Sequence, residues 1–194
     1  MDPDRLRTLI GSAQAGDAEA YRALLDAYGP RLYGYFLRAT GMHHDAEDLL
    51  GEVMLRLVSK LDSYDDRGRF EPWLFRIAAN MVRDRIRRSR ARPGSASLSA
   101  EADSGLTLGE RLQAETENVE AGLLAEEAAA ELHAALAKLD MTTRQMILLR
   151  HFGQMSFREI AEVFECPLGT ALARVHRGLR TLRRMLSGDD ETER

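Results

Sequence analysis

Arginine side chains recur near the carboxyl end of the chain, in a segment whose apolar residues repeat at helical spacing. The arginines are Arg174, Arg177, Arg180, Arg183 and Arg184. Guanidinium groups hydrogen-bond to phosphate oxygens and to base edges, and the major groove of DNA admits one α-helix. These residue types therefore indicate nucleic-acid binding. A solvated basic helix in an ordinary helical domain is the alternative explanation.

A helix-turn-helix is the element that would present these arginines to DNA. Ser156 and Glu159 have the spacing of a capping box, which predicts the start of a first helix there. The chain breaks at residues 165–167, and Pro167 is suited to the first turn of a second helix. Helical spacing predicts that the second helix turns these residues inward: Ala171, Val175, Leu179, Leu182 and Leu186.

The same periodicity extends over most of the chain. A first helix is expected to end at Gly16, and Asp17 is expected to cap a second that Pro30 breaks or kinks before Gly41. Further helices are expected over about residues 45–61, 70–90 and 118–138, and around Met146.

This order of elements predicts an all-α fold. Two helical domains, residues 1–92 and 118–187, are expected to be joined by a flexible acidic linker at 93–117. The C-terminal domain contains the helix-turn-helix, and residues 188–194 are expected to form a disordered tail.

The charges of the chain are segregated. The formal net charge is only −4, which by itself argues against a nucleic-acid binder. However, residues 83–92 hold six arginines and one aspartate, whereas residues 101–131 hold nine acidic residues and one arginine. The average therefore conceals two surfaces of opposite charge.

The composition also argues against several classes of protein. The sequence contains no nucleophile–base pairing, glycine-rich phosphate loop or metal-ligand spacing, so we expect no enzyme activity, cofactor or metal. Cys166 is the single cysteine, which excludes an internal disulfide and favours a reducing compartment. No segment is apolar and long enough to predict membrane insertion, and the amino terminus lacks a signal-peptide pattern.

Two segments carry a resemblance to a known family. Residues 45–92 read DAEDLLGEVMLRLVSKLDSYDDRGRFEPWLFRIAANMVRDRIRRSRAR. Residues 139–184 read LDMTTRQMILLRHFGQMSFREIAEVFECPLGTALARVHRGLRTLRR. With both segments in this order, the chain resembles a minimal RNA polymerase sigma factor of the extracytoplasmic-function (ECF) group of the sigma-70 family.

The resemblance implies a polymerase-docking surface in the first domain. It assigns contacts with the clamp of the largest polymerase subunit to Asp45, Glu47, Asp48, Glu52 and Met54. Carboxylates at helical spacing suit arginines on a partner helix. From the residues alone, a solvated acidic face near a helix amino terminus explains the same pattern equally well.

The resemblance also implies that the first domain recognises and melts the −10 element. It assigns these DNA contacts to Tyr64, Arg67, Arg69, Asn80, Arg83, Arg87 and Arg88. Aromatic rings can stack on an unpaired base, and arginines can hold the phosphates of the strand. Phe70 and Trp73 have suitable side chains, but a core position is the alternative for both.

In the second domain, the resemblance implies recognition of the −35 element by the second helix of the helix-turn-helix. The implied contacts are Thr170, Leu172, Ala173, Arg174, His176, Arg177 and Arg180. Leu172 and Ala173 stand where the family usually has lysine and serine, and Glu165 replaces a glycine common in the turn. Leu172 and Ala173 could contact thymine methyl groups instead.

The resemblance therefore predicts a bacterial, cytoplasmic and nucleoid-associated transcription initiation factor. Its expected partners are promoter DNA and core RNA polymerase, through the clamp of the largest subunit and the flap of the second largest, and an anti-sigma factor. Two alternatives remain: a sigma-like decoy that titrates an anti-sigma factor, and a stand-alone helix-turn-helix regulator of transcription.

Overall fold

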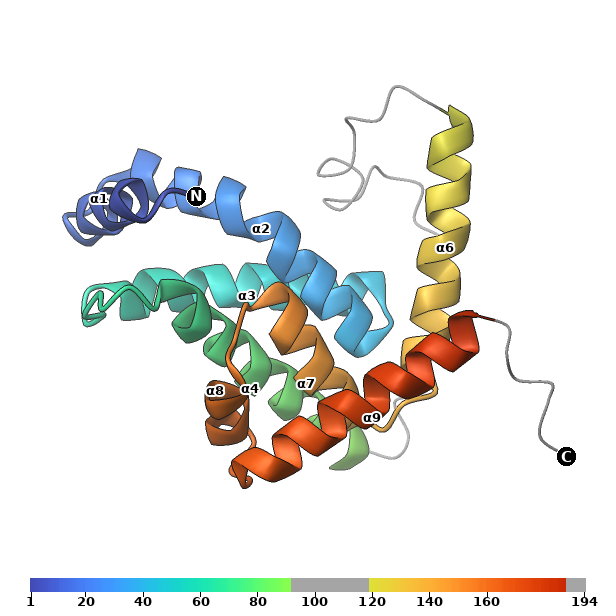
Figure 1. Cartoon of the computed structure of the whole chain (residues 1–194). Helices are drawn as coiled ribbons and strands as arrows, with labels where there is room; N and C mark the ends of the chain where they lie inside the picture. Colours follow the sequence, from blue (N-terminus) through green and yellow to red (C-terminus); the bar gives the residue numbers. More distant parts are fainter. Residues whose placement is uncertain (92–118, 188–194) are drawn as a thin grey trace, which may run out of the picture.

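The computed structural model describes residues 1–91 and 119–187, and these ranges contain α-helices and no strand (Figure 1). The helices of the first half are α1 (Pro3–Gln14), α2 (Ala18–Thr40), α3 (His43–Leu61) and α4 (Phe70–Ala91). Those of the second half are α6 (Val119–Ala137), α7 (Met141–Phe152), α8 (Phe157–Val163) and α9 (Leu168–Leu186). The all-α prediction is confirmed, while the predicted linker and tail lie outside the described residues.

Local signals fix the ends of the first helices. Gly16 has φ = 88°, a left-handed conformation that glycine adopts without strain, and the next residue, Asp17, caps α2 through its side chain. Gly41, with φ = 83°, ends α2. Of the break or kink predicted at Pro30, the break is wrong, because α2 continues through Pro30, which lies on the exposed side of the helix. Burial of the flanking turns against neighbouring helices offsets the missing N–H.

The long helix α2 is the centre of the fold. It packs against α1 and α3 from its own half and against α7 from the second half (Figure 1). Its fully buried side chains include Leu24, Leu32, Tyr35 and Phe36. One hydrophobic cluster consequently runs from the first half into the second, through residues such as Phe75 and Leu149.

In the second half, α9 crosses α7 at a glycine. A Cβ at Gly178 would lie 2.5 Å from Thr143 Cγ2, so the two helices approach more closely there than a larger residue would allow. The line of contact on α9 therefore runs through Ala171, Val175, Gly178 and Leu182, which are buried. The predicted inward orientation of Leu179 and Leu186 is wrong, since both are 46% exposed.

Candidate nucleic-acid and partner interfaces

The helix-turn-helix consists of α8 and α9, and the predicted capping box is confirmed. The backbone N–H of Glu159 donates to Ser156 Oγ at 3.3 Å, and the Glu159 carboxylate accepts from the Ser156 backbone N–H at 2.7 Å. In the turn, Glu165 has φ = 50°, in the left-handed region that favours glycine. The turn thus keeps its tight geometry with a strained residue in the position where glycine was expected.

The outer face of α9 holds the residues predicted to contact the −35 element. Five of them are exposed and two are partly exposed; the exposed ones are Thr170, Ala173, His176, Arg177 and Arg180, and the others are Leu172 and Arg174. Arg174 Nη1 lies 3.3 Å from Asp140 Oδ1, and the His176 ring stacks on Phe157 with centroids 6.0 Å apart. Arg180 forms no ion pair within the described residues. The structure therefore brings these residues together opposite the buried side of α9.

A second arginine-bearing face lies on α4. Asn80, Arg83, Arg87 and Arg88 are all exposed, and they follow one another on the same helix. Arg87 Nη2 lies 3.0 Å from Asp84 Oδ1, and both groups are open to solvent. Arg83 differs from these, because its Nη1 donates a hydrogen bond of 2.7 Å to the backbone carbonyl of Val163 at the end of α8.

The loop that precedes α4 combines an aromatic cluster with charged groups. The Tyr64 ring lies 4.5 Å from that of Trp73 and 5.6 Å from that of Phe70, centroid to centroid. Phe70 is only 1% exposed, so the core alternative is the correct one for this residue. Tyr64 and Trp73 are half-buried. Burial, together with the charge of Asp66, raises the pKa of Tyr64, whose hydroxyl donates to that carboxylate at 3.2 Å. Tyr64 is therefore a partly exposed ring that packs against Trp73 and the buried Phe70.

The two loop arginines differ in their partners. Arg67 pairs with Asp65 at 2.7 Å within the loop, and both side chains are largely exposed. Arg69 pairs with Glu159 of α8, in the second half of the chain. Hydrogen bonding to that carboxylate raises the pKa of the Arg69 guanidinium. Of the residues predicted to contact the −10 element, Arg69 and Arg83 are thus already held by the second half.

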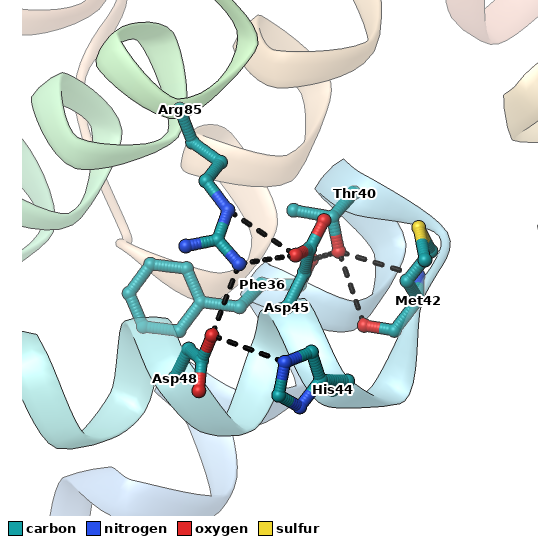
Figure 2. Close-up of polar contacts among 7 residues, drawn as sticks. All are labelled: Phe36, Thr40, Met42, His44, Asp45, Asp48 and Arg85. Atoms are coloured by element: carbon teal, nitrogen blue, oxygen red, sulfur yellow. Dashed lines mark hydrogen bonds and ion pairs between the residues drawn. The ribbon is translucent and has the colours of Figure 1, made fainter. Parts of the chain in front are cut away.

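The acidic residues predicted to dock on a partner are partly used within the protein (Figure 2). Arg85 of α4 reaches across to α3, where it pairs with Asp45 and with Asp48, the latter at 3.0 Å. His44 Nε2 lies 3.5 Å from the same Asp48 carboxylate. The hydrogen bonds that Arg85 donates to the Asp45 and Asp48 carboxylates raise the pKa of its guanidinium. Asp45 thus links α3 to α4 through an ion pair. Asp48 contributes to the same link, but 45% of its side chain stays exposed to solvent.

The other docking predictions occupy different environments on α3. Glu47 is half-buried, Glu52 pairs with Arg56 at 2.7 Å, and Met54 packs against the hydrophobic cluster. Sequence reasoning missed two exposed apolar residues on this helix, Leu55 at 73% and Val58 at 49% exposure. The available signal was their position outside the inward set of α3, which is Ala46, Leu49, Leu50, Val53, Leu57 and Leu61. Leu55 and Val58 thus place exposed apolar surface beside the carboxylates of α3.

Residues 1–91 and 119–187 contain no group of three or more potential metal ligands. The helices described there are also too short or too polar to cross a membrane. A cavity of about 420 Å³ lies between α4 and α7, and Arg83, Arg87 and Gln145 contribute to its walls.

Comparisons with known proteins agree with both halves of this arrangement. Residues 24–92 match the family Sigma-70 region 2, and residues 129–182 match Sigma-70, region 4. The chain is 31% identical over 183 residues to the ECF RNA polymerase sigma factor SigW of Bacillus subtilis (strain 168), covering 93% of this chain and 96% of SigW. It is 32% identical to the ECF RNA polymerase sigma factor BldN of Streptomyces coelicolor, covering 97% of this chain and 68% of BldN.

Two solved structures share the fold. CnrH in complex with the cytosolic domain of CnrY has a TM-score of 0.64 at 24% identity, covering 97% of this chain and 100% of that one. The sigma factor RpoE of Bartonella quintana, in complex with the anti-sigma factor NepR, has a TM-score of 0.59 at 22% identity, covering 88% and 98%.

Proposed function

The chain belongs to the ECF group of the sigma-70 family of RNA polymerase sigma factors. We propose that its two halves have different roles in promoter-specific transcription initiation. Residues 1–92 bind core polymerase and recognise and melt the −10 element, and residues 118–187 recognise the −35 element. Residues 93–117 link them, and residues 188–194 follow as a tail. The observation that carries this proposal is the presence of exposed arginine faces on α4 and on α9, in opposite halves of one chain.

The polymerase clamp is proposed to bind the exposed side of α3. Asp48, Glu47 and Glu52 supply carboxylates, and Leu55 supplies apolar surface that would be covered on binding. Carboxylates at a partially desolvated interface favour arginines on the partner, and the apolar side chain adds affinity. Asp45 and Met54 act indirectly here, because Asp45 pairs with Arg85 and Met54 packs against the core.

DNA is proposed to contact α4 and the loop before it. Asn80 can read a base edge, while Arg83, Arg87 and Arg88 hold phosphates. Tyr64, backed by Trp73, offers a ring for stacking on an unpaired base, and Arg67 and Arg69 follow Tyr64 in the same exposed loop.

The outer face of α9 is proposed to lie in the major groove at the −35 element. Arg174, Arg177 and Arg180 anchor phosphates or guanine edges, and Thr170 and His176 add polar contacts. Leu172 and Ala173 contribute apolar contacts with thymine methyl groups. Each such contact discriminates between base pairs less strongly than the bidentate hydrogen bonds of a polar side chain.

The factor is proposed to act without catalytic residues of its own, in the bacterial cytoplasm and at the nucleoid. An anti-sigma factor is a further proposed partner, because CnrH and RpoE, whose fold this chain shares, were each solved with a bound protein partner. The flap of the second-largest polymerase subunit is the proposed partner of the second half.

The test combines polymerase binding with genomic run-off transcription, using the full chain and core RNA polymerase. Leu55→Asp should weaken polymerase binding by roughly tenfold or more, since burying a leucine contributes about 1.5–3 kcal/mol. Leu25→Asp is the matched control, because Leu25 is an exposed leucine on α2, 39% accessible, outside the proposed interface. Equal polymerase binding by both variants would refute the role of α3.

Run-off transcription separates the alternatives. A stand-alone regulator would bind DNA without polymerase, and a decoy that titrates an anti-sigma factor would direct no transcript from any promoter. A purified chain that neither binds core polymerase nor yields a specific transcript would overturn the proposal itself.

A further inference from the structure

The last residue of α1, Gln14, is joined by hydrogen bonds to the loop of residues 62–69 that precedes α4. Its amide nitrogen donates to the carbonyl of Leu61 at 2.9 Å and to the carbonyl of Tyr64 at 2.8 Å. An amide NH2 group has two hydrogens, so these two bonds use its whole donor capacity. Leu61 is the last residue of α3, where carbonyls have no partner within their own helix. Gln14 therefore ties the loop to the end of α3, from 47 to 50 residues away in the sequence.

The backbone around Gln14 is itself held in place. Ile10 and Ala13, near the end of α1, are buried in the hydrophobic cluster at 1% and 0% exposure. After Gln14 the chain turns at Gly16, which has a left-handed backbone, and enters α2 at the Asp17 cap. The side chain of Gln14 thus starts from a rigid element, which allows its two hydrogen bonds to fix the position of a loop.

A second residue of α1 lies against the same loop. Arg7 precedes Gln14 by two helical turns, on the same side of α1, and its Nε is 3.9 Å from Asp66 Oδ2. Only 16% of the Asp66 side chain is exposed. Asp66 Oδ1 accepts from the Tyr64 hydroxyl at 3.2 Å and from the backbone N–H of Gly68 at 2.9 Å. Tyr64 is consequently held at its carbonyl by Gln14 and at its hydroxyl by Asp66.

These contacts fix the Tyr64 ring, which packs on Trp73 at 4.5 Å, before any DNA is bound. A ring that is already ordered loses little further conformational freedom when an unpaired base stacks on it, so its order favours strand opening. We infer that Gln14 is a positioning residue for melting of the −10 element, which acts through Tyr64 and makes no DNA contact of its own. This inference rests on the proposed role of Tyr64 in stacking on an unpaired base.

The first test measures whether Gln14 orders the loop in the full chain. Gln14→Met keeps a neutral, unbranched side chain of similar length and removes both donors. Thr8→Val is the matched control, because the Thr8 hydroxyl donates to the Asp4 carbonyl within α1. Trp73 is the single tryptophan of the chain, so acrylamide quenching of its fluorescence reports how well the Tyr64 ring covers it. Quenching should be stronger in Gln14→Met than in Thr8→Val, and equal quenching would overturn the inference.

The second test measures strand opening by the holoenzyme of the full chain and core RNA polymerase. One promoter found by run-off transcription is supplied as a duplex and as the same sequence with a premelted bubble over the −10 element. Weaker polymerase binding or a smaller folded fraction lowers transcription from both templates alike. A misplaced Tyr64 ring lowers it mainly on the duplex, where the strands still have to open.

The loss of two hydrogen bonds corresponds to a factor of roughly five or more in an equilibrium constant. We therefore expect Gln14→Met to lower the duplex-to-bubble ratio of initial transcription rates by roughly fivefold, and Thr8→Val to leave it unchanged. A ratio that Gln14→Met does not change would contradict a positioning role in melting.

Tyr64→Ala shows whether Gln14 acts through the ring. This variant lacks the ring but keeps the backbone carbonyl to which Gln14 donates. When Gln14→Met is added to Tyr64→Ala, the duplex-to-bubble ratio should fall no further, because the group that Gln14 positions is already gone. A further fivefold fall would show that Gln14 acts independently of Tyr64 and would overturn the inference.

Failure of the proposed function has a separate signature. Tyr64→Ala alone should lower the duplex-to-bubble ratio if its ring takes part in melting. An unchanged ratio for that variant, or no binding of core polymerase by the unmodified chain, would count against the proposed function. Quenching of Trp73 requires neither polymerase nor DNA, so it tests the hold of Gln14 on the loop whatever those results are.

Discussion

The crossing of α7 and α9 at Gly178 predicts that alanine, normally the better helix residue, destabilises the protein there. A Cβ at this position would lie 2.5 Å from Thr143 Cγ2 and 2.8 Å from Ile147 Cδ1. The end of the Ile147 side chain can rotate away. The β-branched Thr143 side chain is restricted to few rotamers, and the residue is only 5% exposed to solvent, so it cannot move aside. The helices must therefore separate, which costs about 1–3 kcal/mol in a packed interior.

The net effect includes the helix propensity of alanine. Replacing glycine by alanine inside a helix contributes about 1 kcal/mol of stability, so Gly178→Ala should lower the free energy of unfolding by roughly 0–2 kcal/mol. Gly51→Ala in α3 is the matched control, because no atom lies within 4 Å of a Cβ placed there. That control should raise the free energy of unfolding by about 1 kcal/mol.

Urea unfolding followed by far-ultraviolet circular dichroism measures both variants against the unmodified chain. The difference between Gly178→Ala and Gly51→Ala isolates the steric cost, which we expect to be about 1–3 kcal/mol. If Gly178→Ala proves as stabilising as Gly51→Ala, the close approach of α7 and α9 is refuted. The outward orientation of Leu179 would then lose its explanation as well.

Three further predictions concern stability. Tyr35→Phe should raise the thermal unfolding temperature, by an amount corresponding to about 1 kcal/mol, because the buried Tyr35 hydroxyl finds no hydrogen-bond partner among residues 1–91 and 119–187; a lower temperature would contradict this. Glu165→Gly should stabilise the chain toward urea by roughly 1 kcal/mol through relief of the left-handed backbone, and an unchanged midpoint would count against strain in the turn. Hydrogen bonds from Arg31 lower the pKa of Glu71 in the folded protein. The ionised Glu71 carboxylate therefore stabilises the fold fully above its ordinary pKa of 4.5, and this stabilisation is lost as the pH falls through the lowered pKa. Unfolding titrations across that acidic range should therefore show a shallower loss of stability for Glu71→Gln, and equal slopes would contradict the prediction.

Much of the local structure followed from short-range patterns. The capping box at Ser156, the aspartate cap at Asp17 and the helix-ending Gly41 involve groups within four residues of each other, so the sequence order alone brings them together. The large buried side chains of α3 follow the helical period of the sequence, because an amphipathic helix repeats its apolar side chains with its own period. The residues proposed to read the −35 element share one face of α9 for the same reason.

The errors came from contacts between helices. Periodicity predicted Leu179 as inward, but a broad apolar arc does not tell which of its residues the neighbouring helix covers, and Gly178 moved the line of contact to one side. The acidic residues Asp45 and Asp48 were expected to face a partner, yet both form ion pairs with Arg85, 37 to 40 residues away. No local pattern records such a partner.

The sequence by itself determined the helices, their caps, the two arginine-bearing faces and the resemblance that identifies the family, because each of these depends on residue type at fixed short spacing. Only the tertiary structure decided which charges remain accessible. Arg83 and Val163 are 80 residues apart, and their hydrogen bond exists because α7 packs against α2 and carries α8 onto α4. Packing across the whole chain therefore governs which of the predicted DNA-binding arginines are available, since the geometry that joins distant segments is set by the fit of their surfaces.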